Sequence, residues 1–120
     1  MNDAAQPEPT EPYGFREYQQ ATPLTAIYPR ERALEYLTLG LVGEAGELAN
    51  KIKKVIRDRG GAMHLDTKAA MVGEMGDCLY YISELCNLIG VDMDEVARGN
   101  IHKLSERASR GTLRGDGDSR

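Results

Sequence analysis

The stretch LEYLTLGLVGEAGELANKIKKVIR, residues 34–57, decides the fold of this chain. Its apolar residues recur at intervals of three, four and seven, which is the period of one face of an α-helix. They share a stripe roughly 60° wide on a helical wheel, made of Leu34, Leu37, Leu41, Leu48, Ile52 and Val55. The pattern predicts a long amphipathic helix from Arg30 to about Arg57, with one face packed against another element.

A second helical pattern extends from about Thr67 to Leu88, with Asp66 as its expected N-cap and Gly90 as its C-terminal stop. Its apolar stripe comprises Met71, Met75, Cys78, Ile82, Leu85 and Ile89. A short glycine-containing segment, RDRGGAMHLD, separates the two patterns and predicts a turn. Two long helices joined by a short turn are expected to lie antiparallel.

The remaining chain predicts shorter elements. Residues 15–20 are compatible with a short helix, and ATPLTAIYP is expected to be extended because proline disfavours a helical residue before it. Asp92 is a candidate cap for a third helix that ends near Ala108. We therefore predict a disordered leader over residues 1–13, a domain over 14–110 and a Gly-rich charged tail over 111–120.

The fold class that follows is all-α, because no stretch has the alternation of a β-strand. We expect an antiparallel helical bundle of two long helices plus one or two shorter ones. A helical chain of 120 residues buries only a modest core. The bundle is therefore expected to be completed by oligomerisation, as a homodimer or homotetramer.

Composition narrows the function classes. The 19 acidic residues outnumber the 15 basic ones, which argues against a protein that coats a nucleic-acid polymer or an anionic membrane. Cys78 and Cys86 lie about 12 Å apart along one predicted helix, too far for a disulfide within it. Two reduced cysteines, together with the lack of a spanning stretch or secretion signal, favour a cytoplasmic protein.

Two similar motifs, GEAGE at 43–47 and GEMGD at 73–77, place acids on the apolar faces of the two long helices. Glu44 falls inside the first stripe, and Glu47 lies about 60° to one side. Glu74 borders the second stripe, and Asp77 is again about 60° further round. All four acids are therefore expected to point toward or along the seam between the helices.

Ionised carboxylates at a buried seam are unfavourable unless something neutralises them. They can share protons, pair with buried Lys or Arg, or bind cations. Mg²⁺ prefers oxygen ligands, so acids spaced i,i+3 on two facing helices suit it, with Mn²⁺ as a substitute. No histidine lies in the set, which disfavours zinc or a Glu-x-x-His di-iron centre. The alternatives are a solvated acidic face and a non-catalytic dimeric module with a salt-bridged acidic seam.

Four glycines interrupt the two predicted helices at positions where each costs about 1 kcal/mol relative to alanine. They are Gly43, Gly46, Gly73 and Gly76. Such a cost indicates either that the helices approach closely or that room is needed beside the acids for a ligand.

GLVGEAGELANKIKK followed by GEMGDCLYYIS resembles the MazG-like, all-α nucleoside triphosphate pyrophosphohydrolases, whose signature is ExxE followed after a gap by ExxD. The resemblance extends from Glu17 to Arg120. It implies hydrolysis of a nucleoside triphosphate to monophosphate and pyrophosphate, and it leaves open whether the nucleotide is canonical or aberrant. It also implies that Glu44, Glu47, Glu74 and Asp77 hold Mg²⁺, and our choice for the residue that orients the water is Glu47.

Further residues are candidates for substrate binding. Lys54 follows the first motif and is placed either to reach the triphosphate or to lie on a solvated basic face. The resemblance suggests that Asn100 and Lys103 contact phosphate or sugar. The remaining candidates are Gln19 and Tyr28 for the base, Tyr81 for the nucleoside or the core, and Arg120 in a tail that either closes over the site or frays.

Overall fold

The computed structural model describes residues 13–115, 117 and 118. These residues form helices and no strand, which confirms the all-α prediction. The elements in order are α1 Phe15–Ala21, the 3-10 helices η1 Thr22–Thr25 and η2 Arg30–Arg32, and then α2 Ala33–Arg59, α3 Leu65–Ile89 and α4 Met93–Arg110. Most of the predicted leader and three residues of the tail lie outside the described residues.

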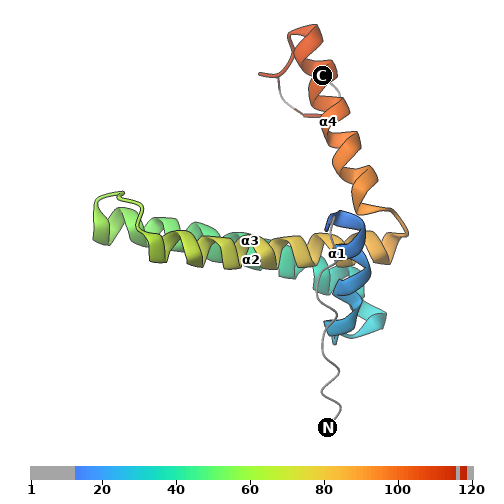
Figure 1. Ribbon diagram of the computed structural model, residues 1–120, viewed down its shortest axis with the longest axis horizontal. Helices are drawn as coiled ribbons and strands as arrows, with labels where there is room; N and C mark the ends of the chain where they lie inside the picture. The colour runs from blue at the N-terminus through green and yellow to red at the C-terminus, as the bar shows by residue number, and fades with distance from the viewer. Residues whose placement is uncertain (1–12, 116, 119–120) are drawn as a thin grey trace.

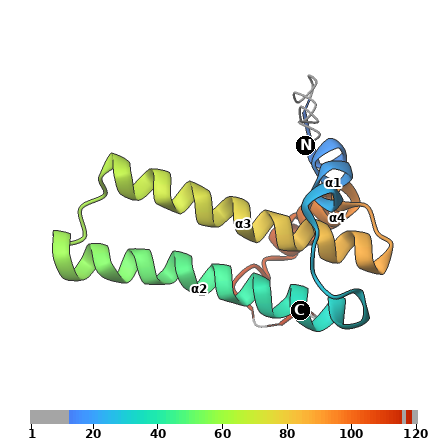
Figure 2. The ribbon, with the colours of Figure 1, turned by 90° about the horizontal axis from the view of Figure 1, so that it is seen from below.

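The two long helices lie side by side and antiparallel, as predicted (Figures 1 and 2). α2 ends at Gly60 and α3 ends at Gly90, both in the left-handed conformation that glycine adopts without a Cβ penalty. Asp66 is not the N-cap of α3, because the helix begins at Leu65 after His64. The Asp66 carboxylate instead pairs with Arg59 across the turn, at 2.7 and 2.8 Å, and so closes the hairpin.

The segment ATPLTAIYP is not extended throughout, contrary to the prediction. Thr22–Thr25 forms the 3-10 helix η1 with Pro23 in its first turn, where a missing N–H costs no internal hydrogen bond. Extended backbone follows only from Ala26, and Pro29 then precedes η2 and α2. The predicted start of the long helix at Arg30 therefore coincides with a 3-10 turn.

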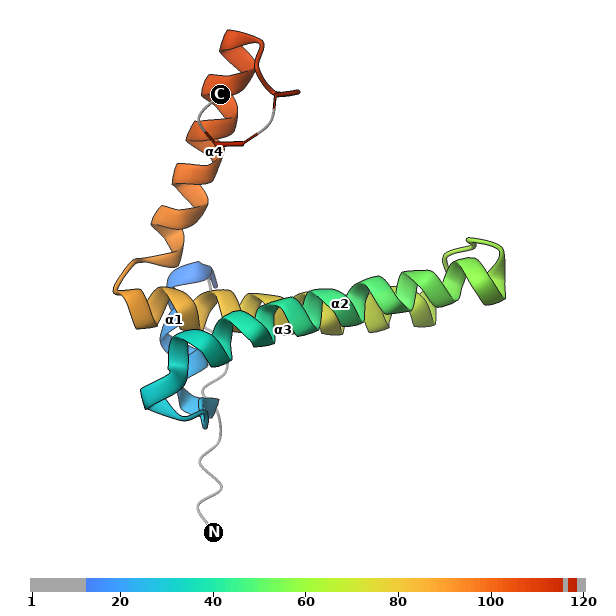
Figure 3. The ribbon, with the colours of Figure 1, turned by 180° about the vertical axis from the view of Figure 1, so that it is seen from behind.

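The short helices gather at one end of the α2–α3 hairpin. α1 packs against α3 and α4, whereas α4 leaves the end of α3 and points away from the hairpin at a steep angle (Figures 1 and 3). Within the described residues α4 does not pack against α2. The resulting shape is open, with extents of 55 × 40 × 34 Å.

A buried polar network fixes this crowded end. The Glu84 side chain of α3 is 1% exposed. One of its oxygens accepts the Tyr28 hydroxyl at 2.8 Å, and the other accepts Thr22 at 2.9 Å and Asn87 at 3.0 Å. Ser83, which is fully buried, lies 2.8 Å from the Thr22 hydroxyl. Because both oxygens of the carboxylate receive hydrogen bonds, the network ties the segment between Thr22 and Tyr28 to α3.

The apolar core is small and lies beside this network. Tyr28, Ala33 and Leu37 form it, and Tyr81 and Leu85 of α3 pack against them. Several residues of the predicted stripes are exposed in the single chain, namely Leu34, Met75 and Ile89. Other large apolar side chains of the hairpin are also exposed, including Leu39, Val42, Ile56 and Val72. Exposed apolar area of this extent is typical of surfaces that another molecule covers.

The glycines divide into two kinds. A Cβ on Gly40 would collide with the Tyr81 ring, so α2 and α3 approach closely there. A Cβ on any of the four motif glycines, Gly43, Gly46, Gly73 and Gly76, would meet no atom within 4 Å. Of the two explanations offered for the motif glycines, close approach of helices within one chain is wrong, and open space beside the acids is what the structure shows.

The contrast predicts opposite effects for two matched substitutions in α2. Gly40→Ala should lower the free energy of unfolding by about 1–3 kcal/mol, because the Tyr81 ring must move from its packed position. Gly43→Ala should raise the same free energy by up to ~1 kcal/mol through helix propensity. Urea denaturation followed by circular dichroism measures both. A loss of stability in Gly43→Ala would show that another molecule presses on that face.

Candidate metal centre

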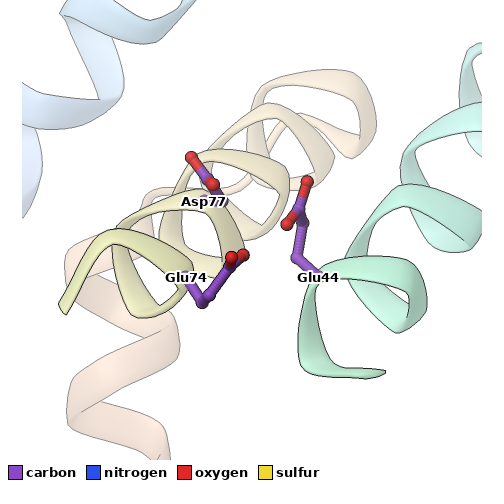
Figure 4. Close-up of side chains that lie close together, drawn as sticks. All are labelled: Glu44, Glu74 and Asp77. Carbon is purple, nitrogen blue, oxygen red and sulfur yellow. The ribbon is translucent and has the colours of Figure 1, made fainter. Parts of the chain in front are cut away.

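Three of the four predicted acids meet across the seam between the long helices. Glu44 projects from α2 toward Glu74 and Asp77 of α3 (Figure 4). Each offers one carboxylate oxygen, and the three oxygens lie within 4.8 Å of one another. Glu44 and Glu74 are half-buried, whereas Asp77 is exposed. The carboxylates thus form a cluster that is sheltered on one side and open on the other.

Mutual repulsion shapes the protonation of this cluster. A hydrogen bond with Glu74, followed by burial and the charges of Asp77, Glu74 and Glu47, raises the pKa of Glu44. The carboxyl group of Glu44 therefore keeps its proton to a higher pH than an isolated glutamate does. Lys51 of α2 places its Nζ 3.3 Å from Glu74 Oε1 and supplies a positive charge at the cluster.

The donor set fits a hard divalent cation. Carboxylate oxygens are the ligands that Mg²⁺, Mn²⁺ and Ca²⁺ prefer. Opposite ligands of an octahedral Mg²⁺ are about 4.2 Å apart, given Mg–O distances of about 2.1 Å. A spread of up to 4.8 Å is therefore slightly wide for one Mg²⁺, and small side-chain rotations would close it.

Glu47 lies one turn after Glu44 and is exposed, outside the group of three carboxylates. Its charge nevertheless contributes to the raised pKa of Glu44. Its predicted role as a ligand stays a prediction.

Other side chains border the cluster. Burial, and then the charges of Glu44, Asp77 and Glu74, raise the pKa of the Cys78 thiol, so it stays a neutral neighbour and not a thiolate ligand. Tyr18 of α1 donates to the Gly76 carbonyl at 3.5 Å. The Tyr81 ring packs on α2 at Gly40, and its pKa is raised by burial, Tyr36 and Glu44. The cluster therefore has aromatic neighbours toward α1.

Gln19 and Tyr28, predicted for the base, are engaged in the structural network. The Gln19 amide donates to Asn87 at 3.0 Å and to the Val91 carbonyl at 2.8 Å, and its oxygen accepts the Met93 N–H at 2.7 Å. The Tyr28 hydroxyl is bound to Glu84. These bonds clamp α1 and the following loop onto α3 and α4, so both residues position elements in the described structure.

The predicted residues of α4 do not lie with the acids of their own chain. Asn100 is exposed, and Lys103 lies 3.2 Å from Asp118 of the tail. Asp118 also pairs at 2.9 Å with Arg107, which is 4% exposed beneath the tail. Within one chain the described part of the tail thus lies along α4 and not over the carboxylates (Figure 1). Arg120 lies outside the described residues.

Two cavities flank the cluster. One of about 310 Å³ lies toward the hairpin turn and is lined by the predicted Lys54 together with Lys51, Val55, Asp58, Arg59, Asp66, Thr67 and Ala70. The other, of about 380 Å³, lies beside α1 and is lined by Tyr13, Gly14, Phe15, Tyr18 and Leu79. A basic cavity therefore lies on one side of the acids and an aromatic one on the other.

The comparisons with known proteins agree with this geometry. Residues 32–111, which hold the hairpin, the three acids and α4, match the model of the MazG nucleotide pyrophosphohydrolase domain. The chain belongs to the MazG family. It is also 41% identical over 109 residues to the Gene 37 protein of Mycobacterium phage L5, covering 86% of this chain and 96% of that protein. No solved structure gave a significant match.

Membership in the MazG family makes this a nucleotide pyrophosphohydrolase at the level of the family, and such enzymes generally depend on divalent metal. No helix among the described residues is long and apolar enough to cross a membrane. The sequence prediction missed two interactions, namely the ion pair of Lys51 with Glu74 and the buried hydrogen bonds of Glu84. The contact of Lys51 with Glu74 is signalled only by its place seven residues after Glu44, on the same helix face. For Glu84, the signal in the sequence is that an acidic residue lies on the buried face of α3.

The raised pKa of Glu44 predicts how the stability of the metal-free protein depends on pH. Glu44 in the folded protein binds its proton to a higher pH than the value of 4.5 that it has in an unfolded chain. Between these two pKa values the folded state holds more protons, so the free energy of unfolding falls as pH rises through that window.

Glu44→Gln should remove this fall and raise the melting temperature at neutral pH by a few degrees in EDTA. Thermal melts across pH 4–8 measure it, with the exposed Glu31→Gln as a control that keeps the wild-type slope. An unchanged slope in Glu44→Gln would show that the pKa of Glu44 is not raised in the folded protein.

Proposed function

We propose that this MazG-family protein hydrolyses nucleoside triphosphates to nucleoside monophosphate and pyrophosphate, with Mg²⁺ as its metal and Mn²⁺ as a substitute. The observation that carries the proposal is the cluster of Glu44, Glu74 and Asp77, within 4.8 Å, in a seam that leaves open space beside it. Two free cysteines support a cytoplasmic location, where such nucleotides are made and used.

In the proposed mechanism the carboxylates of Glu44, Glu74 and Asp77 would hold the metal at the seam, beside the space open to the triphosphate. Bound Mg²⁺ supplies neutralisation of phosphate charge and polarisation of the attacking water. Glu47, exposed at the edge of the cluster, orients this water and takes its proton. The water oxygen bonds to the α-phosphorus as the bond to the bridging oxygen breaks, and pyrophosphate leaves.

The flanking cavities give the substrate a direction. The aromatic cavity at α1 suits a flat base, because Tyr13, Phe15 and Tyr18 offer ring faces and edges. Tyr18 lines this cavity and contacts the Gly76 carbonyl next to Asp77, so a sugar would pass beside it. We therefore place the nucleoside toward α1 and the phosphates toward the hairpin turn, with Gln19 and Tyr28 supporting the nucleoside end from behind.

A second chain completes this site in our proposal. Asn100 and Lys103 lie on a helix that points away from its own hairpin, so they reach phosphate or sugar only on another copy. The exposed Leu39, Val42 and Val72 would be covered in the same contact. A homodimer, or a dimer of dimers, accounts for both observations.

The first test is the product. The protein with Mg²⁺ should release pyrophosphate, and not orthophosphate, from a member of a panel of canonical, deoxy and oxidised nucleotides. Glu47→Gln and Asp77→Asn should each lower the rate by at least about 100-fold while the helical circular dichroism stays unchanged. Orthophosphate as the product, or no release from any nucleotide, would favour the non-catalytic interaction module instead.

Mixing inactive variants tests the shared site. Asp77→Asn lacks a metal ligand and Lys103→Ala lacks the proposed phosphate contact, so each should be nearly inactive alone. After unfolding and refolding together they should recover about a quarter of wild-type activity, because half of the dimers are mixed and each has one intact site. Asp77→Asn mixed with Glu47→Gln, whose lesions share one hairpin, should recover none. Equal activity in the two mixtures would show that α4 does not complete the site of a second chain.

A further inference from the structure

Lys51 is bound to the carboxylate cluster from the inside of the seam. Its Nζ lies 3.3 Å from Glu74 Oε1, and the two side chains are 32% and 16% exposed. In the other ion pairs of the hairpin, Arg57–Asp58 and Arg59–Asp66, the carboxylates are 53% and 67% exposed. A lysine on the face of α2 that carries Glu44 is thus held at the acids, where screening by solvent is weak.

In the metal-free protein the Lys51 ammonium neutralises carboxylate charge, as a bound divalent cation would. Among the described residues, the cluster of Glu44, Glu74 and Asp77 has Lys51 as its one salt-bridged cation. A divalent ion held by Glu74 would lie a few ångströms from the ammonium and repel it. The two cations therefore compete for the same oxygen.

A neighbouring space can receive the displaced lysine. Lys51 lines the cavity of about 310 Å³ toward the hairpin turn, together with Lys54 and Arg59. The two acids of this cavity are already paired, Asp58 with Arg57 and Asp66 with Arg59, each through two contacts of 2.7–2.8 Å. The cavity is thus suited to an anion larger than a single carboxylate.

We propose that Lys51 is an exchangeable counter-ion, which pairs with Glu74 in the metal-free protein and binds the terminal phosphates of the substrate once divalent cations occupy the carboxylates. The cavity beside it is then the subsite for the pyrophosphate group. The pyrophosphate subsite rests on the proposed function, whereas the competition between Lys51 and the metal concerns metal binding alone. Exchange of this kind keeps the seam neutralised before and after loading.

The experiment uses calorimetry on the full chain after EDTA treatment. Lys51→Met removes the competing charge and should bind Mg²⁺ about tenfold more tightly than wild type in the absence of nucleotide. Lys51→Arg keeps a charge, and Lys53→Met removes an exposed one from the same helix, so both should stay within about twofold of wild type. Lys51→Gln replaces Lys51→Met if the latter unfolds without metal.

Titration with inorganic pyrophosphate in excess Mg²⁺ tests whether Lys51 and the neighbouring cavity bind pyrophosphate. Lys51→Met should bind it about tenfold more weakly than wild type, and Lys53→Met should bind it unchanged. Opposite shifts of the two affinities in one variant are the signature of exchange. Equal or weaker Mg²⁺ binding by Lys51→Met overturns the competition, and unchanged pyrophosphate binding overturns the subsite. Because neither titration needs turnover, failure to cleave any nucleotide refutes the proposed function separately.

Discussion

A carboxylate between packed helices needs hydrogen-bond donors or positive charge to offset its burial. The acids of α3 meet this need in two different ways. Glu84 is compensated completely by the chain itself, because Tyr28, Thr22 and Asn87 all donate to it. Glu74 and Asp77 lie two to three turns earlier beside Glu44, and in this cluster Lys51 pairs with Glu74. A buried polar group that is fully bonded is part of the scaffold. A group that is left partly compensated is where the chain accepts something from outside.

The two ends of the hairpin differ for the same reason. The Glu84 network holds α1, η1 and the start of α4 against α3, so this end is fixed by hydrogen bonds that need particular donors. Toward the turn there is no such network among the described residues, and pairing of Arg59 with Asp66 closes the hairpin. The carboxylate cluster lies between a fixed end and an open one. It is thus supported by rigid helices while one side stays accessible, as a site for a charged ligand requires.

The sequence predicted what depends on local periodicity. The spacing of Leu37, Leu41 and Val55 was sufficient for α2, and glycines at 60 and 90 marked the ends of the long helices. Partner choice between distant residues was not predictable. Asp66 looks like a cap until Arg59 is placed across the turn, and Gln19 and Tyr28 look like ligands for a base until their partners on α3 and α4 are known.

The site was predicted further than its surroundings because its acids lie on apolar stripes. Glu44 and Glu74 were placed at the seam by helical geometry alone, and the structure brings them together with Asp77. Lys51 could not be ranked above Lys53 or Lys54 by composition, since all three follow the motif within two turns. Only packing shows that one of them turns inward.

Energetics also separate a ligand site from an inert acidic seam. A buried ion pair is often replaced by apolar residues with no loss of stability, so a purely structural seam has no need for three acids around one lysine. The neighbouring glycines add a further cost in helix propensity without bringing these two helices closer. Residues that weaken the isolated fold in two independent ways at one place are expected where function sets the requirement. A cation that neutralises the acids and a ligand that fills the space beside the glycines would relieve both costs together.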